Sequence, residues 1–219
     1  VIAWVVEAAQ RAQGVDQVVV ATSNLKQDDL IVKWCDRERV HVFRGSENDV
    51  LERFYQCAKE HNGTVLIRLT ADCPFLDYNV ISDVVNLRSM TGASYTSNID
   101  PPTYPDGLDV ECFTFSALEC AMAEATRASD RDCVPQFISR NRDRFPAYNL
   151  TCPLPGLASE RWVLDTKEDY VFCQALAKLM RMHSKTYQSI LGVLKRNPKL
   201  RDINKMWTRN ERFYEHVST

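Results

Sequence analysis

QVVVA (residues 17–21) is a short β-branched segment that predicts a strand buried on both faces. TVLIRL (residues 64–69) is a second such segment, and VHVF (residues 40–43) predicts a strand between them. Helical patterns occupy the intervening stretches, at residues 28–38 and 50–60. This β-α-β-α order predicts right-handed crossovers and a mainly parallel sheet.

The same patterns predict the rest of the chain as one α/β domain over residues 1–219, with a core of about residues 1–182. A mainly parallel sheet flanked by helices would give three layers. The helix near residue 50 could be capped by Ser46 or Asp49, and Thr166 with Asp169 resembles a capping box. Further helices are expected at residues 2–13, 78–89, 116–125 (capped by Ser116), 133–140, 166–182 and in a tail at 187–219, and strands at 93–97, 110–114 and 161–164.

The composition excludes several classes of protein. Hydrophobic residues make up 45% and charged residues 26%, which is ordinary for a globular domain. A formal net charge of −2 argues against a dedicated nucleic-acid binder. No apolar segment approaches the roughly 18 residues of a membrane span. The 8 cysteines are scattered without a C-x-x-C pair, which predicts free thiols in a reducing compartment and a cytoplasmic location.

Polar residues gather where the predicted strands end. In open α/β sheets ligands bind at the carboxyl ends of the strands. Two acidic residues, Asp72 and Asp165, stand at such ends, together with small hydroxyl and glycine positions. This pattern predicts a site for a phosphate-bearing ligand with a hard divalent cation. The strand-end segments are 21–23, 44–46, 70–74, 98–109 and 165–166.

Several of these residues also have an ordinary structural interpretation. Asp72 could bind Mg²⁺ or form an Asx turn before Cys73 and Pro74, and Asp165 could simply begin a helix. Arg68 lies within an apolar strand, where its charge needs a partner. It could bind phosphate or pair with an acidic neighbour, and the sequence favours neither.

Two loops have the polarity expected of a binding site. Arg44-Gly45-Ser46 would let backbone approach a ligand and offers a planar donor group, although it also suits a polar loop with a helix cap. Thr22 and Ser23 could line a base pocket or cap a helix. The segment from Tyr104 to Glu111 is the densest polar stretch, and its acids could bind sugar hydroxyls or orient a nucleophile.

Other familiar sites are missing from the sequence. There is no G-x-G-x-x-G or Walker A loop, which disfavours dinucleotide oxidoreductases and P-loop NTPases. The four histidines do not cluster, and no nucleophile elbow is present.

Four segments, taken together and in order, resemble the blocks of the spore-coat-polysaccharide-type cytidylyltransferases. This family shares the GT-A, nucleotide-diphospho-sugar transferase-like fold with the CMP-sialic-acid and 3-deoxy-manno-octulosonate cytidylyltransferases. The resemblance runs from Val1 to about Asn204. The segments are RGSENDVL (44–51), RLTADCP (68–74), YPDGLDVE (104–111) and RWVLDTKED (161–169).

The resemblance implies transfer of CMP from CTP to an acidic or modified sugar, with release of pyrophosphate, for surface polysaccharide or glycan precursors. It implies Mg²⁺ as cofactor, held by Asp72 and Asp165, with Arg68 as a further catalytic residue. The nucleotide site would comprise Ala21, Thr22, Ser23, Arg44, Ser46 and Thr70. The acceptor site would comprise Tyr104, Asp106, Asp109, Glu111 and Arg161.

This sequence departs from the family at its start. Such enzymes begin with a central strand and a loop bearing Gly, Arg and Lys that binds the triphosphate, whereas this sequence begins in what resembles the following helix. We therefore expect an upstream segment to be lacking, which would leave apolar edges on strands 17–21 and 64–69. A non-catalytic nucleotide-sugar-binding subunit is the alternative if that loop is absent.

Two further questions stay open in the sequence. A GT-A glycosyltransferase would generally show a D-x-D pair, and Thr70-Ala71-Asp72 supplies only one acid. The acceptor could be a nonulosonic acid, an amino sugar, a polyol phosphate or a phosphonate. Trp207, Phe213 and Tyr214 in the tail could form a homodimer contact or a peripheral core contact.

Overall fold

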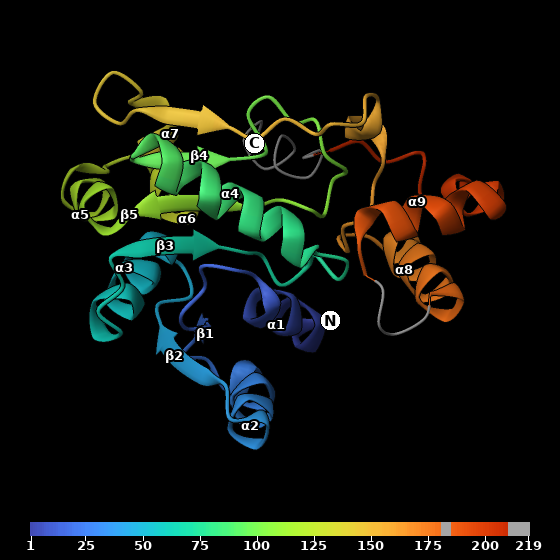
Figure 1. The fold of residues 1–219 in the computed structure, drawn as a ribbon. Helices are drawn as coiled ribbons and strands as arrows, with labels where there is room; N and C mark the ends of the chain where they lie inside the picture. The colour runs from blue at the N-terminus through green and yellow to red at the C-terminus, as the bar shows by residue number, and fades with distance from the viewer. Residues whose placement is uncertain (181–184, 210–219) are drawn as a thin grey trace.

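A computed structural model describes residues 1–180 and 185–209 of the chain (Figure 1). Short 3₁₀ turns at Lys26–Asp28, Leu157–Ser159 and Pro198–Ile203 accompany the main elements. The helices are α1 (Ile2–Arg11), α2 (Asp29–Glu38), α3 (Val50–Glu60), α4 (Tyr78–Thr91), α5 (Phe115–Glu124), α6 (Ala128–Asp132), α7 (Gln136–Arg140), α8 (Lys167–Leu179) and α9 (Tyr187–Arg196). The strands are β1 (Val19–Ser23), β2 (His41–Gly45), β3 (Val65–Arg68), β4 (Tyr95–Ser97), β5 (Glu111–Thr114) and β6 (Ala147–Asn149).

The strands form two sheets. β1 and β2 pair in parallel, and a four-stranded sheet has the order β3-β5-β4-β6. The α/β class is confirmed, but β5 runs antiparallel to both β3 and β4, so the larger sheet is mixed. The reason is the connection between β4 and β5, a loop without a helix, which returns the chain in the opposite direction. Within residues 1–180 and 185–209, β1 and β3 each pair along one edge.

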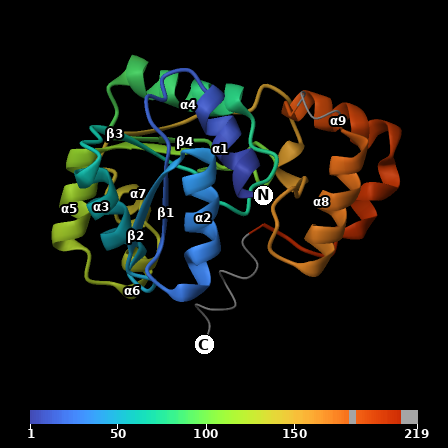
Figure 2. The same ribbon diagram turned by 90° about the horizontal axis from the view of Figure 1, so that it is seen from below.

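Helices cover both faces of the larger sheet (Figure 2). Cys112 of β5 belongs to the apolar cluster that includes α1 and α4, whereas the next residue, Phe113, belongs to the cluster formed with α3 and α5. This alternation is what a strand with two buried faces requires, because successive side chains point to opposite sides. The sheet therefore separates two cores, as the predicted three layers imply.

Some predicted elements are wrong in detail. Thr114 caps α5, since its hydroxyl accepts from the amide of Ala117 at 3.2 Å, and Ser116 already lies in the first turn. The helix expected at 133–140 begins only at Gln136, as α7, because Pro135 lacks the N–H that a continuous helix needs. The short helix α6 precedes the expected range and was not predicted. Residues 161–164 form only an isolated bridge with Asp106, and β6 was missed because three residues carry too little pattern.

The capping predictions at α3 and α8 hold. Asp49 accepts from the amide of Glu52 at 2.9 Å, which makes it the cap of α3. Thr166 and Asp169 form a reciprocal capping box at the start of α8. The predicted end of that helix, near Met182, lies outside the described residues. Figure 1 shows the arrows of β3 and β6 pointing towards α8 and α9, so both helices lie beyond the carboxyl ends of these strands.

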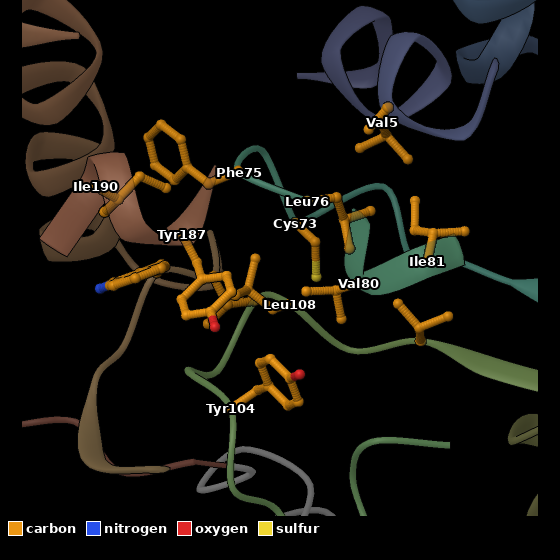
Figure 3. Packing of buried hydrophobic residues seen from close by; sticks show 14 of the residues in the cluster. Val5, Cys73, Phe75, Leu76, Val80, Ile81, Tyr104, Leu108, Tyr187 and Ile190 are labelled. Atoms are coloured by element: carbon orange, nitrogen blue, oxygen red, sulfur yellow. The ribbon is translucent and has the colours of Figure 1, made fainter. Parts of the chain in front are cut away.

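The C-terminal helix α9 packs into the larger core. Tyr187 and Ile190 belong to the cluster that also holds Cys73, Leu108 and residues of α4. The rings of Tyr104 and Tyr187 meet edge to face at 5.7 Å between centroids (Figure 3). This packing fixes the loop before β5 against the helical C-terminal part.

Two predictions from composition agree with the structure. All eight cysteines are free, and six of them are buried. Among the described residues, none of the helices has the length and apolar character needed to cross a membrane.

Candidate active site

The turn after β3 and the segment before α8 are joined through the backbone. The amide of Leu164 donates to the carbonyl oxygen of Asp72 at 2.8 Å. The two predicted metal carboxylates, Asp72 and Asp165, therefore stand on adjoining segments although 93 residues separate them in the sequence. Burial raises the pKa of Asp165, and the charge of Asp72 raises it further, whereas Arg161 lowers it. Asp72 is thus close enough to repel Asp165, and a cation between them would relieve that repulsion.

The turn at the end of β3 is held by its own side chains. The hydroxyl of Thr70 lies 3.1 Å from the sulfur of Cys73, which in turn lies 3.4 Å from a carboxylate oxygen of Asp72. Burial raises the pKa of the Cys73 thiol well above its ordinary value, and the charges of Asp72 and Asp109 add to the rise. Asp109 is therefore near this turn as well.

Arg161 is the centre of a buried ionic network. Its guanidinium pairs with Asp106 at 3.0 Å, with Asp165 at 3.1 Å and with Asp169 at 2.8 Å. Burial alone would raise the pKa of Asp169, but hydrogen bonds from Arg161 and Asn204 bring it below its ordinary value. The predicted acceptor role of Arg161 does not fit this geometry, because its side chain is only 8% exposed and its donors are taken by carboxylates.

Asp106 also makes its contacts inside the protein. It is buried, and Arg161 donates to its Oδ2. Gly107 follows with a φ of +101°, and a Cβ there would lie 2.7 Å from the carbonyl carbon of Trp162. Glycine is needed at this position because the loop approaches the backbone of the segment before α8 so closely. Asp106 and Gly107 thus fasten the loop beside Asp165.

Asp109 is the acid of this loop that keeps contact with solvent. Its side chain is 30% exposed and lies 3.0 Å from Arg209. Burial raises the pKa of Asp109 to about 7, against the opposing charge of Arg209. Of the predicted acceptor residues, Asp109 alone combines partial exposure with a perturbed carboxylate.

Arg68 pairs with an acidic neighbour, which is the structural alternative to binding phosphate. Its guanidinium pairs with Glu111 at 2.7 Å, directly across the β3–β5 ladder, and the hydroxyl of Tyr95 donates to the other oxygen of Glu111 at 2.7 Å. Glu111 is buried, so this pair satisfies a charge inside the sheet. The geometry argues against the predicted catalytic role of Arg68 and the predicted acceptor role of Glu111.

The predicted nucleotide residues of β1 and β2 lie side by side. Thr22 is in register with Arg44, and the carbonyl of Ser23 accepts from the Nε of Arg44 at 3.1 Å. Arg44 also pairs with Asp29 at 2.8 Å. Ala21 precedes these residues on β1. The hydroxyl of Ser46 accepts from the amide of Asp49 at 3.1 Å, which shapes the loop into α3.

Sequence reasoning missed three residues of this region. Asp28 accepts hydrogen bonds from the Thr22 hydroxyl and the Ser23 amide, which lower its pKa. Asn204 and Arg209, from the chain after α9, reach Asp169 and Asp109. The sequence holds no local signal for the last two, because their partners are 35 and 100 residues away.

Comparison with known proteins places these features in a family. The family model described as "Cytidylyltransferase" matches residues 1–191. An uncharacterized protein of Methanocaldococcus jannaschii, MJ1063, is 33% identical over 200 residues, covering 90% of this chain and 81% of that protein. The spore coat polysaccharide biosynthesis protein SpsF of Bacillus subtilis is 29% identical over 186 residues, covering 84% of this chain and 76% of SpsF.

Solved structures similar to this chain also include a cytidylyltransferase. A cytidylyltransferase from Leptospira borgpetersenii serovar Hardjo-bovis superposes with a TM-score of 0.84 at 27% identity, covering 91% of this chain and 84% of that one. A CMP:2-keto-3-deoxy-manno-octonic acid synthetase complexed with CTP shares the fold, with a TM-score of 0.55 at 12% identity over 81% of this chain and 87% of that one. With the family model matching most of its length, the chain belongs to the cytidylyltransferase family.

Proposed function

We propose that this protein transfers CMP from CTP to a hydroxyl of an acidic or modified sugar, releasing pyrophosphate, in the synthesis of a surface polysaccharide or glycan precursor. The observation that carries the proposal is the backbone contact between Leu164 and Asp72, which brings Asp165 beside Asp72 in a chain of this family. The name of the Bacillus subtilis relative, a spore coat polysaccharide biosynthesis protein, supports a role in polysaccharide precursors.

The chemistry of the two carboxylates fits Mg²⁺. Magnesium is usually held by one or two carboxylates, with substrate phosphates and water completing its octahedron. Among the described residues there is no cluster of three or more metal-binding side chains, so the protein would supply only the pair Asp72 and Asp165. When bound, the ion would neutralise negative charge on the phosphates and on the leaving pyrophosphate.

The nucleotide would lie at the ends of β1, β2 and β3. Arg44 ties the two strands of the smaller sheet together through the carbonyl of Ser23, which supports a rigid platform there. Ala21, Thr22 and Ser46 would complete this surface, and Thr70 would face the phosphates from the turn after β3. Such a platform would restrict the orientation of CTP before reaction.

Asp109 would bind the hydroxyl of the acceptor and take its proton. The acceptor oxygen attacks the α-phosphorus of CTP, a new oxygen–phosphorus bond forms, and the bond from that phosphorus to the pyrophosphate oxygen breaks. The hydroxyl proton passes to the carboxylate of Asp109, whose pKa of about 7 suits a group that accepts and releases a proton near neutral pH. Tyr104, packed on Tyr187, would hold the loop in place for this step.

The test is pyrophosphate release from CTP. The purified protein is incubated with CTP and, in separate reactions, 3-deoxy-manno-octulosonate, N-acetylneuraminate, an amino sugar and a polyol phosphate, each with and without Mg²⁺. We expect release that requires both one acceptor and Mg²⁺. Transfer from UDP-glucose without pyrophosphate release would indicate a GT-A glycosyltransferase, and CTP binding without release would indicate a non-catalytic subunit.

A further inference from the structure

Arg161 contacts one of the two proposed metal carboxylates directly. Its Nη2 donates to Oδ2 of Asp165 at 3.1 Å. The same nitrogen donates to Asp169 at 2.8 Å, and Nε donates to the second oxygen of Asp169 at 3.0 Å. The paired bonds to Asp169 fix the plane of the guanidinium, because a planar donor group meets a carboxylate in one orientation. The bond to Asp165 is therefore made from a fixed position.

The remaining donors of Arg161 are also engaged. Nη1 donates to Oδ2 of Asp106 at 3.0 Å and to the carbonyl of Thr208 at 3.2 Å. Asn204 donates to Asp169 at 2.8 Å and to the carbonyl of Arg161 at 3.2 Å. The segment after α9 thus completes the network around Arg161.

The network carries more negative than positive charge. Arg161 faces three carboxylates, those of Asp106, Asp165 and Asp169, and the next cation, Arg209, is 3.9 Å from Asp106. Asp72 adds a further negative charge that acts on Asp165. Arg161 therefore orients Asp165 without cancelling the charge that a divalent cation would need.

We propose that Arg161 is a positioning residue for the metal site: its bond to Oδ2 holds the carboxylate of Asp165 in one orientation, and the segment 204–208 keeps Arg161 in place. This inference rests on the proposed function, because it requires Asp165 to be a metal ligand. It explains why a buried arginine stands four residues before that aspartate. Groups that orient a metal ligand in this way typically change metal affinity by about 10- to 100-fold when they are replaced.

The test measures Mn²⁺ binding by electron paramagnetic resonance in the presence of CTP, with Mn²⁺ in place of Mg²⁺. The variants are Arg161→Lys, Asp165→Asn and the double variant, with Arg201→Lys as matched control. Arg201 is an arginine of the same region that pairs with Glu160 at 2.7 Å. Isothermal titration of CTP without metal gives the affinity for the nucleotide alone.

We expect Arg161→Lys to weaken Mn²⁺ binding about 10-fold, because lysine has no planar group that can hold both Asp165 and Asp169. Metal-free CTP affinity should not change, Arg201→Lys should match the wild type, and Arg161→Lys should add nothing when Asp165 is already asparagine. An equal loss in both backgrounds, or wild-type Mn²⁺ affinity in folded Arg161→Lys, would overturn the inference while leaving the proposed function intact.

Asn204→Ala decides the matter if Arg161→Lys does not fold. This milder change removes the hydrogen bonds from Asn204 to Asp169 and to the carbonyl of Arg161. We expect Mn²⁺ affinity to fall about 3-fold, less than for a group that contacts the metal ligand directly, because Asn204 acts on Asp165 only through Arg161. Unchanged affinity would contradict the inference. If the wild-type protein binds no Mn²⁺ that depends on Asp165, both the inference and the proposed metal site fail.

Discussion

Leu164 donates its backbone amide to the carbonyl of Asp72 at 2.8 Å, and this bond joins the turn after β3 to the segment that enters α8. A backbone bond of this kind uses neither side chain, so it joins the two segments without engaging the carboxylate of Asp72 or of Asp165. Backbone groups also move less than long side chains, which makes the bond a suitable frame for a metal site.

Replacing Asp72 or Asp165 by asparagine should abolish catalysis without unfolding the protein. We expect pyrophosphate release from CTP to fall by about 100-fold or more, which corresponds to roughly 2.7 kcal/mol of transition-state stabilisation. Initial rates with the best acceptor, together with circular dichroism spectra, measure the two effects. Asp100→Asn is the control, because Asp100 pairs with Arg142 on the exposed surface. Full activity in both site variants would refute the metal assignment.

The buried pair of Asp169 and Arg161 should matter far more for stability than an exposed pair of the same shape. Asp169 is fully buried, and its carboxylate accepts hydrogen bonds from Arg161 and from the amide of Thr166. Asp169→Asn replaces one acceptor oxygen with a donor group and breaks this buried ion pair, so we expect a loss of about 3 kcal/mol in the free energy of unfolding. Glu124→Gln is the matched control, since Glu124 accepts two bonds from Arg144 at the surface. Urea unfolding should show little change for that control, and similar losses for the two variants would contradict the argument.

Local patterns predicted the elements that surround the site. Val50–Glu60 was predicted to the residue, because an amphipathic pattern and the cap at Asp49 lie within one short stretch. The turn carrying Asp72 was located for a similar reason, since it follows an apolar strand directly. The mixed sheet could not be predicted in this way, because the direction of β5 depends on how a long loop folds.

The sequence could not predict which residues form ion pairs with the charged side chains. Arg68 could have bound phosphate, and only the register that places it opposite Glu111 reveals an internal pair. Arg161 was assigned to the acceptor, whereas its partners lie 4, 8 and 55 residues away and include Asp165 itself. A charge pattern shows that a partner is needed, and tertiary packing decides which one it is.

Gly107 should tolerate substitution less well than another glycine with positive φ. A Cβ at this position would lie 2.8 Å from the backbone nitrogen of Val163, and the φ of +101° is already unfavourable for alanine. We expect Gly107→Ala to cost about 3 kcal/mol, the upper part of the range for backbone strain. Gly156→Ala is the control, because Gly156 has a φ of +77° and no atom within 4 Å of the added carbon. Gly156→Ala should lower the free energy of unfolding by about 1 kcal/mol. Equal unfolding midpoints for the two variants would contradict the close approach of Gly107 to the backbone of Trp162 and Val163.

Asp109 should make the protein less stable as the pH rises through neutrality. Burial raises the pKa of Asp109 to about 7, whereas an unfolded aspartate titrates near pH 4. Between these values the folded protein keeps a proton that the unfolded chain has lost. The contribution is therefore fully present below pH 4 and is lost as the pH rises to 7. Because the carboxylate is partly exposed, we expect the free energy of unfolding to decline by about 2 kcal/mol, which is less than the full difference between the folded and unfolded pKa would give.

Asp109→Asn should remove this decline, since the amide stays neutral at every pH. Urea unfolding at pH 4.5, 6 and 8 would then give a flatter profile for the variant than for the wild type, with the largest gain in stability at pH 8. Asp202→Asn is the control, because Lys205 lowers the pKa of that surface carboxylate and its titration lies below this range. If the wild type and Asp109→Asn lose stability in parallel between pH 4.5 and 8, Asp109 does not hold its proton in the folded state. The proton transfer proposed for it at neutral pH would then lack its physical basis.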